Sequence, residues 1–215
     1  MIEVWGRRNS SNVQAVIWCL VELNLPYKRY DIGHRHGGNT TPEFLAMNPN
    51  GTIPVLRDNN SAPLWESAAI LRYLSSKYGN DTFWPKDPLA RAQVDKWAEW
   101  AKVNFGGNFS QPVFWQVVRT PPSKRDAVAI GEAVGRVGRV LDIAEEQLGR
   151  NRFIAGEEFT MADVQFGHLL FRYFDIEIER GEERPCLRRY YEGLVEREAF
   201  REHVMVDYGE LRVFD

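Results

Sequence analysis

The segment from Asn48 to Tyr78, NPNGTIPVLRDNNSAPLWESAAILRYLSSKY, constrains the fold of this chain most strongly. It predicts a turn, a strand over Pro54–Arg57, a hairpin turn, a second strand over Pro63–Trp65 and a helix that begins at Ser67. A proline inside an apolar strand is unusual, because its nitrogen has no hydrogen to donate to a neighbouring strand. The segment therefore predicts a loop and a helix N-terminus that present backbone groups to a small anionic peptide.

The residues before this segment alternate strand and helix. We expect strands over Ile2–Trp5 and Tyr27–Ile32, with a helix over Asn12–Leu23 between them. This order is a βαβ unit, which places the two strands parallel. A short helix is expected after Thr41, because Pro42 suits the first helical position. Residues 1–79 thus predict an α/β domain of thioredoxin-like order, βαβ-α-ββα.

The strand signal largely disappears after a polar, proline-containing linker over residues 80–88. Apolar residues at helical spacing predict a helix over Ala90–Phe105 and a last amphipathic helix around Leu187–Leu194. We expect residues 89–215 to form an all-α domain.

Two local signals mark helix starts in this second domain. Ser123 and Asp126 resemble a capping box with Asp in place of Glu, and Thr160 with Asp163 forms a sharper one. Close packing of the long helix after Asp126 against another helix is predicted by three glycines on a common side, Gly131, Gly135 and Gly138.

Composition narrows the class of protein. The net charge is −3, and residues 1–80 carry 8 Lys/Arg against 6 Asp/Glu, so neither part is basic enough for nucleic acid. No apolar run approaches a membrane span. Cys19 and Cys186 match no metal or redox spacing, and His34-x-His36 is interpreted as an exposed loop, so we expect no metal site. These features favour a cytoplasmic protein.

Glu66 and Ser67 stand where the second hairpin strand runs into a helix. The Ser67 hydroxyl and the free amides of the first turn suit a carboxylate, and Glu66 suits an ammonium group of the same ligand. The alternative is an ordinary serine cap beside a solvated glutamate. Local sequence leaves both open, and it also leaves Pro54 open between a cis peptide and a trans edge-strand proline.

Three motifs together resemble the cytosolic glutathione transferase family, in particular its bacterial, theta-like and nu-like members: NPNGTIPVL, ESAAILRYL and FIAGEEFTMADV. The resemblance covers nearly the whole chain. It implies glutathione as co-substrate, no permanently bound cofactor and a homodimer. It also implies a cis bond before Pro54 and glutathione contacts from Ile53, Pro54, Glu66, Ser67 and Asn39.

Family members carry Tyr, Ser or Cys after the first strand, where the side chain meets the glutathione sulfur. The corresponding turn here has no Tyr or Cys, and Ser10 matches the theta-like serine position. Asn12 matches an asparagine of nu-like members, and Ser11 lies between them. We expect Ser10 to be the sulfur contact, with Asn12 and Ser11 as alternatives. Ala68 and Gln14 stand where many relatives have arginine, which leaves the subclass open.

The resemblance places the electrophile between the two domains. Candidate lining residues come from the helix after the linker and the loop after the first strand: Phe105, Phe109, Phe114, Trp115, Arg119 and Arg7. The predicted activity is conjugation of the glutathione thiolate to small electrophiles. Two alternatives are a glutathione-dependent disulfide-bond reductase and a non-catalytic binding protein that kept the fold.

Overall fold

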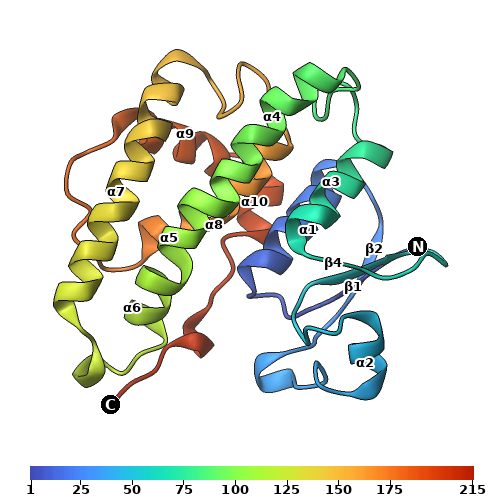
Figure 1. Cartoon of the computed structure of the whole chain (residues 1–215), viewed down its shortest axis with the longest axis horizontal. Helices are drawn as coiled ribbons and strands as arrows, with labels where there is room; N and C mark the ends of the chain where they lie inside the picture. The colour runs from blue at the N-terminus through green and yellow to red at the C-terminus, as the bar shows by residue number, and fades with distance from the viewer.

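A computed structural model describes all 215 residues, with a small sheet and its helices at one end and a helical bundle at the other (Figure 1). The strands lie in the order β2-β1-β3-β4, and their bounds are β1 (Ile2–Trp5), β2 (Tyr27–Tyr30), β3 (Val55–Asp58) and β4 (Leu64–Trp65). β1 pairs with β2 in parallel and with β3 antiparallel, and β3 and β4 form the antiparallel hairpin. The thioredoxin-like prediction is confirmed.

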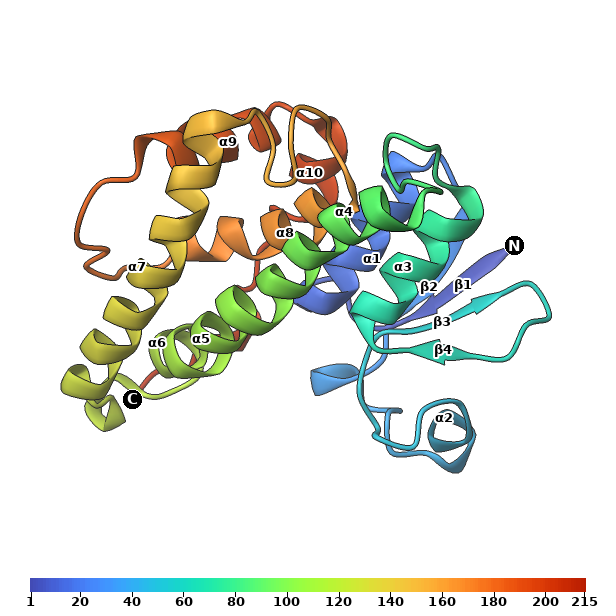
Figure 2. The same ribbon diagram turned by 45° about the horizontal axis from the view of Figure 1, so that its top comes forward.

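The main helices of this half are α1 (Ser11–Glu22), α2 (Pro42–Met47) and α3 (Ser67–Tyr78), and η1 (His34–His36) is a single 3₁₀ turn. α1 and α3 lie together between the sheet and the helical bundle, while α2 lies apart from both (Figure 2). Thr41 caps α2 as predicted, since its hydroxyl accepts a 3.3 Å hydrogen bond from the Phe44 amide. α1 and α3 therefore both face the helical domain, where they contact α8.

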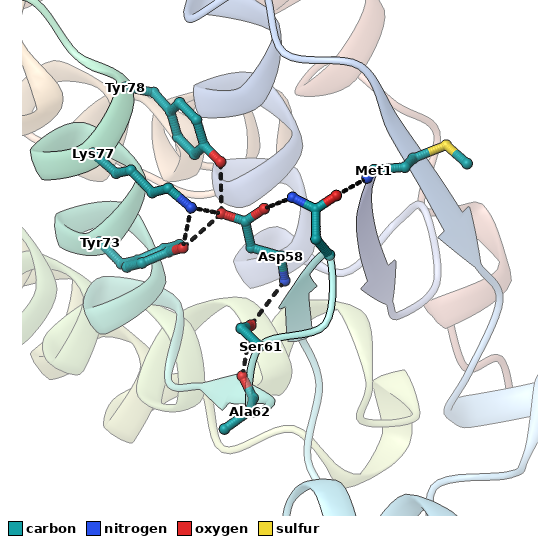
Figure 3. Close-up of polar contacts among 8 residues, drawn as sticks. Met1, Asp58, Ser61, Ala62, Tyr73, Lys77 and Tyr78 are labelled. Atoms are coloured by element: carbon teal, nitrogen blue, oxygen red, sulfur yellow. Dashed lines mark hydrogen bonds and ion pairs between the residues drawn. The ribbon is translucent and has the colours of Figure 1, made fainter.

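A buried carboxylate ties the β3–β4 hairpin to α3 (Figure 3). Asp58 accepts 2.6 Å hydrogen bonds from the hydroxyls of Tyr73 and Tyr78 and a 2.6 Å ion pair from Lys77. Burial alone would raise the pKa of Asp58, but these three donors lower it to about 2. The hairpin that leads into Ser67 is thus held against the helix that follows it.

One continuous helix runs from Pro88 to Val118 and links the two halves of the fold. It consists of α4 (Pro88–Trp100), η2 (Ala101–Gly106), α5 (Gly107–Phe109), η3 (Ser110–Trp115) and α6 (Gln116–Val118). The helix predicted to end at Phe105 is therefore longer. η2 and η3 are π-helical, a wider geometry that often occurs at functional sites.

The bundle is completed by η4 (Pro122–Lys124), α7 (Ala127–Arg150), α8 (Met161–Asp175), α9 (Pro185–Val195), α10 (Glu198–His203) and η5 (Gly209–Leu211). The capping box of Thr160 and Asp163 is confirmed at the start of α8. The capping box predicted at Ser123 is wrong, because Asp126 itself caps α7 by accepting from the Ala129 amide at 2.9 Å. Ser123 instead hydrogen-bonds Asp215 near the C-terminus.

The predicted packing of the α7 glycines is mostly wrong. A Cβ added at Gly131 would meet no atom within 4 Å, and one at Gly135 would meet only the Arg139 side chain of the same helix. Gly138 is buried, and the Arg184 guanidinium lies over it and donates a 3.0 Å hydrogen bond to its carbonyl. Arg184 packs on this side of α7 at Gly138, and no neighbouring helix backbone lies close to the three glycines.

The two halves share one continuous hydrophobic core of 46 buried residues that runs from Ile2 to Leu211. Trp18 of α1 is fully buried at their junction, with its ring centroid 4.9 Å from that of Phe200. Nearby, Arg197 forms a 2.5 Å ion pair with Glu22.

No helix is both long enough and apolar enough to span a membrane. α3 ends at Tyr78 and α4 begins at Pro88, and the exact domain boundaries stay a prediction.

Candidate active site

A groove of about 420 Å³ lies between the two halves of the fold. The N-terminus of α1 supplies Ser11 and Asn12, and α8 supplies His168 and Leu169. The long helix forms the rest of the wall with Lys102, Gly106, Gly107, Ser110, Gln111, Pro112 and Trp115. Both π-helical segments therefore contribute residues to this groove.

The loop before β3 is held in one shape by its own side chains. Asn48 is buried and donates to the Thr52 carbonyl at 2.8 Å, while Asn39 donates to the Gly51 carbonyl at 2.8 Å. The Ile53–Pro54 peptide bond is cis, as the family resemblance implies. The N–H and C=O of Ile53 form no hydrogen bond within the protein. The loop thus offers a free pair of backbone groups to an extended ligand.

The N-terminus of α3 is open to an anion. Its first intrahelical bond runs from the Ile70 amide to the Glu66 carbonyl at 3.0 Å, and no side chain caps the helix. The amides of the first turn, beginning with Ser67, are therefore unpaired, and the helix dipole favours negative charge there. Glu66 is exposed and has a φ of 67°, an uncommon backbone conformation that clusters at ligand sites.

The N-terminus of α1 has the same open character. Ser10 is the N-cap residue, but its hydroxyl caps no amide and the residue is 8% exposed. Ser11 and Asn12 are half-buried and line the groove, whereas Ser10 is not among the lining residues. The structure therefore brings two of the three predicted sulfur contacts to the groove wall and leaves Ser10 just behind it.

Lys102 of η2 reaches across the groove and was not identified from the sequence. Its ammonium donates to the Ser67 hydroxyl at 3.0 Å and to Asn12 Oδ1 at 3.2 Å, and the Ser67 hydroxyl donates to the same Oδ1 at 3.3 Å. A lone lysine within a long helix carries no spacing signal, so only the fold reveals this contact. The two helix N-termini are thus joined by one cation from the second domain.

His168 lies beside Lys102 on the groove wall and is almost fully buried. Burial, followed by the charge of Lys102, lowers the pKa of His168 to about 3, so the imidazole is neutral at physiological pH. Its Nδ1 lies 3.3 Å from the Val164 carbonyl. A neutral histidine adds no charge to the groove, which leaves Lys102 as the charged group on this wall.

The predicted electrophile residues divide into two sets. Trp115 is 41% exposed and lines the groove, and the Arg119 guanidinium lies 4.6 Å from the centre of its ring. The other three aromatic candidates lie in the hydrophobic core: Phe105, Phe109 and Phe114. Phe105 and Phe109 pack against Tyr173 of α8, and Phe114 packs against Tyr208. None of the three lines the groove, so we do not retain them as lining residues.

Three arginines near the groove have no carboxylate within ion-pair distance: Arg7, Arg119 and Arg172. Arg172 of α8 is buried, donates to the Asn9 carbonyl at 2.5 Å and lies over the rings of Phe114 and Tyr208. Burial and the charge of Arg119 lower the pKa of Arg7. The Glu210 carboxylate opposes this lowering, and Arg7 lines a neighbouring pocket together with Glu210 and Asp207, so the charge of Arg7 is partly compensated.

Neither cysteine belongs to the groove. Cys19 is fully buried in α1, where burial raises the pKa of its thiol to about 12. Cys186 is half-buried on α9. No group of three or more His, Cys, Asp or Glu side chains is arranged to hold a metal ion. Any reactive sulfur in the groove must come from a ligand.

Comparisons with known proteins agree with this geometry. The family model "Glutathione S-transferase, N-terminal domain" matches residues 9–77, and "Glutathione S-transferase, C-terminal domain" matches residues 109–198. The chain is 38% identical over 207 residues to glutathione S-transferase GstB of Escherichia coli strain K12, covering 96% of this chain and 99% of GstB.

Two further relatives bear on the site. A glutathione-bound crystal structure of the theta class glutathione S-transferase from Xanthomonas axonopodis pv. citri matches with a TM-score of 0.89 and 39% identity, covering 96% of this chain and 98% of that one. The disulfide-bond oxidoreductase YghU of Escherichia coli strain K12 is 31% identical over 168 residues, covering 74% of this chain and 56% of YghU. By full-length similarity in sequence and fold, this chain belongs to the glutathione S-transferase family.

Proposed function

We propose that this protein is a glutathione transferase that conjugates the thiolate of glutathione to small electrophiles in the groove between its two domains. The observation that carries the proposal is the 3.3 Å contact between Ser67 and Asn12. It brings the helix end suited to the γ-glutamyl carboxylate next to the helix end suited to the thiol. Two related transferases, 38% and 39% identical in alignments that cover 96% of this chain, support the same ligand.

The γ-glutamyl and cysteinyl residues of glutathione each have proposed contacts. The α-carboxylate binds the free amides and hydroxyl at Ser67, and the α-ammonium binds Glu66. The cysteinyl backbone pairs with the free N–H and C=O of Ile53 beside Pro54. Asn39 stays a proposed contact as well, since its side-chain oxygen is unused after its amide donates to Gly51.

For the sulfur contact we now favour Asn12 over Ser10, because Asn12 lines the groove and its amide nitrogen donates to no protein atom. A free thiol has a pKa of about 8.5, so a donated hydrogen bond and the positive end of α1 raise the thiolate fraction near pH 7. The thiol proton leaves to solvent. The sulfur then forms a bond to the electrophilic carbon, and the leaving group departs with its electron pair.

Calorimetry with glutathione, followed by turnover of an aryl chloride, tests this proposal. We expect binding at millimolar glutathione or below and release of chloride in step with loss of free thiol. Absence of binding at millimolar glutathione would rule out both glutathione-dependent activities and leave the non-catalytic binding protein.

A second candidate function is a glutathione-dependent disulfide-bond reductase. Two observations favour it: the similarity to YghU, and a groove without a protein thiol, which requires glutathione to supply both electrons of the reduction. Two glutathione thiols would be oxidised to one disulfide for each substrate disulfide reduced. Turnover of hydroxyethyl disulfide that exceeds turnover of aryl and alkyl halides would favour this function over conjugation.

The electrophile is proposed to lie against Trp115, with Arg119 and Arg7 nearby. The charge of Arg119, which forms no ion pair with a carboxylate of the protein, favours an electrophile that carries a carboxylate. The guanidinium of Arg119 is exposed and already oriented by the indole ring 4.6 Å away, so it can bind a carboxylate without leaving Trp115.

We also propose a homodimer in the cytoplasm. Apolar side chains on the outer side of the long helix support a dimer, since Leu89 is 70% and Val103 is 57% exposed. Light scattering coupled to size exclusion is expected to report twice the chain mass of 24.9 kDa, and a mass equal to one chain would contradict the dimer.

A further inference from the structure

A polar cluster made by Lys102, Ser67 and Asn12 joins the proposed carboxylate site to the proposed sulfur site. Lys102 comes from η2 of the helical domain, and the other two residues begin α3 and α1 of the thioredoxin-like domain. All three contacts among them lie between 3.0 and 3.3 Å. Each glutathione-facing helix end is therefore connected to the other through one side chain of the second domain.

The ammonium group decides which way the Asn12 amide faces. A lysine ammonium has three donors and no acceptor, so only the oxygen of the Asn12 amide can lie against it. The Ser67 hydroxyl donates to the same oxygen at 3.3 Å. When the Ser67 hydroxyl, which has a single proton, turns to donate to a bound carboxylate, the ammonium still holds this oxygen, so the amide directs its NH₂ group away from Lys102. That NH₂ group donates to no protein atom.

Lys102 is suited to this task because its charge is not committed elsewhere. It is half-buried and forms no ion pair within 4.0 Å with any carboxylate. The pKa of Lys102 is lowered by burial, and the more distant carboxylates of Glu66 and Glu99 offset only part of this lowering. The remaining titratable neighbour, His168, is neutral. The ammonium therefore acts on the cluster and on an incoming anion at Ser67.

We propose that Lys102 is a positioning residue that holds the Asn12 amide with its NH₂ toward the glutathione sulfur and connects this orientation to the carboxylate site through Ser67. The inference rests on the proposed function, because it assigns a role within the same glutathione site. It makes the thiol-activating group of the first domain dependent on a residue of the second.

The test is the thiolate absorbance titration of bound glutathione in Lys102→Met and Lys102→Arg. We expect Lys102→Met to raise the thiol pKa by about one unit, which is a tenfold loss of thiolate at pH values below that pKa. Lys102→Arg keeps a donor-only cation and is expected to restore most of the shift. Lys96→Met is the matched control, because Lys96 is an exposed lysine on the same long helix.

A double-mutant cycle separates orientation of Asn12 from a general effect of charge. If Lys102 acts through Asn12, Lys102→Met adds little to the thiol pKa of Asn12→Ala. Equal shifts in both backgrounds would overturn the proposal, and so would an unchanged thiol pKa in Lys102→Met that still binds glutathione. If Lys102→Met does not fold, Lys102→Gln replaces it in the same cycle. The Gln amide can present its oxygen to Asn12, so it no longer forces the Asn12 oxygen to face position 102.

Glutathione binding by the unmodified protein distinguishes a failure of the proposed function from a failure of the Lys102 role. Absence of glutathione binding by the unmodified protein would overturn the proposed function. Normal glutathione binding with an unchanged thiol pKa in Lys102→Met would overturn the positioning role alone. S-methylglutathione, which has no free thiol, provides the affinity measurement that does not depend on ionisation of the sulfur.

Discussion

The hydroxyl of Tyr190 in α9 donates a 2.9 Å hydrogen bond to the buried carboxylate of Asp163 at the start of α8. The same carboxylate accepts from the Ile154 amide at 3.0 Å and the Thr160 amide at 2.8 Å. Asp163 thus joins the α8 cap to α9 and to the loop before α8. Because α8 supplies the groove wall at His168 and Leu169, this contact fixes part of the active site from a distance.

We therefore expect Asp163→Asn to destabilise the protein by about 2–3 kcal/mol, because an amide nitrogen would face a backbone donor in place of a carboxylate oxygen. Urea unfolding followed by circular dichroism provides the measurement. Glu146→Gln, which alters an exposed 3.5 Å ion pair on α7, is the control and is expected to stay within about 0.5 kcal/mol. Equal stabilities of the two variants would contradict the role of Asp163.

Asp58 predicts a specific dependence of stability on pH. The folded-state pKa is about 2, below the unfolded value of about 3.9, so the carboxylate stabilises the fold fully above pH 3.9. This contribution is on the order of 1–2 kcal/mol, because one of the three donors, Lys77, is half-exposed. It is lost as the pH falls toward 2. Asp58→Asn is expected to lower stability at pH 7 and to flatten the acid limb of unfolding free energy against pH.

The sulfur contact can be assigned by comparing Asn12→Ala with Ser10→Ala. We expect Asn12→Ala to raise the pKa of the bound thiol by about one unit or more, since a hydrogen bond to a charged group contributes about 1.5–3 kcal/mol. Ser10→Ala is expected to change it little, because Ser10 does not line the groove. The reverse pattern in the thiolate absorbance titration would return the role to Ser10.

Ser67→Ala is expected to weaken glutathione binding about tenfold, because a hydroxyl that donates to a carboxylate contributes about 1.5 kcal/mol or more. Calorimetry with S-methylglutathione measures this loss without interference from thiol ionisation. Ser76→Ala removes a hydroxyl from the exposed side of the same helix and serves as the control. An unchanged affinity in Ser67→Ala would move the carboxylate site away from the α3 N-terminus.

Arg119→Leu tests the preferred class of electrophile. We expect the catalysed rate with a haloacetate to fall about tenfold or more relative to the matching haloacetamide, since only the acid carries the charge that Arg119 would bind. Uncatalysed rates are subtracted for both compounds. Arg136→Leu, on the exposed face of α7, controls for loss of one positive charge. A parallel fall for acid and amide would indicate loss of Trp115 packing and not loss of carboxylate binding.

Much of the fold could be predicted because it depends on local chemistry. The alternation of strand and helix up to Tyr78, the turn at Asn48–Gly51 and the cap at Thr160 each depend on a few adjacent residues. The long helix was harder to predict, because the helix expected over Ala90–Phe105 stops directly before Gly106 and Gly107, and Pro112 follows them. In the structure the helix continues through them by widening into π-helical segments around these residues.

The glutathione contacts stay predictions that rest on the family resemblance, because local sequence leaves the roles of Glu66, Ser67 and Pro54 open. The structure places these residues at an open helix end and a cis peptide. The three phenylalanines of the long helix could not be assigned, because composition does not tell which side of a helix faces the core. Helix periodicity past the π-helical segments does not follow the usual 3.6 residues per turn.

The sequence by itself determined the fold class, the glutathione-binding segment and the family, because these depend on residues that are neighbours along the chain. Only the tertiary structure decided which groups meet in the groove. Lys102, Asn12 and Ser67 are separated by 35 to 90 residues, yet they share one set of hydrogen bonds. Such a cluster leaves no periodic or local trace in the sequence, because it forms only when the two domains pack on their common core.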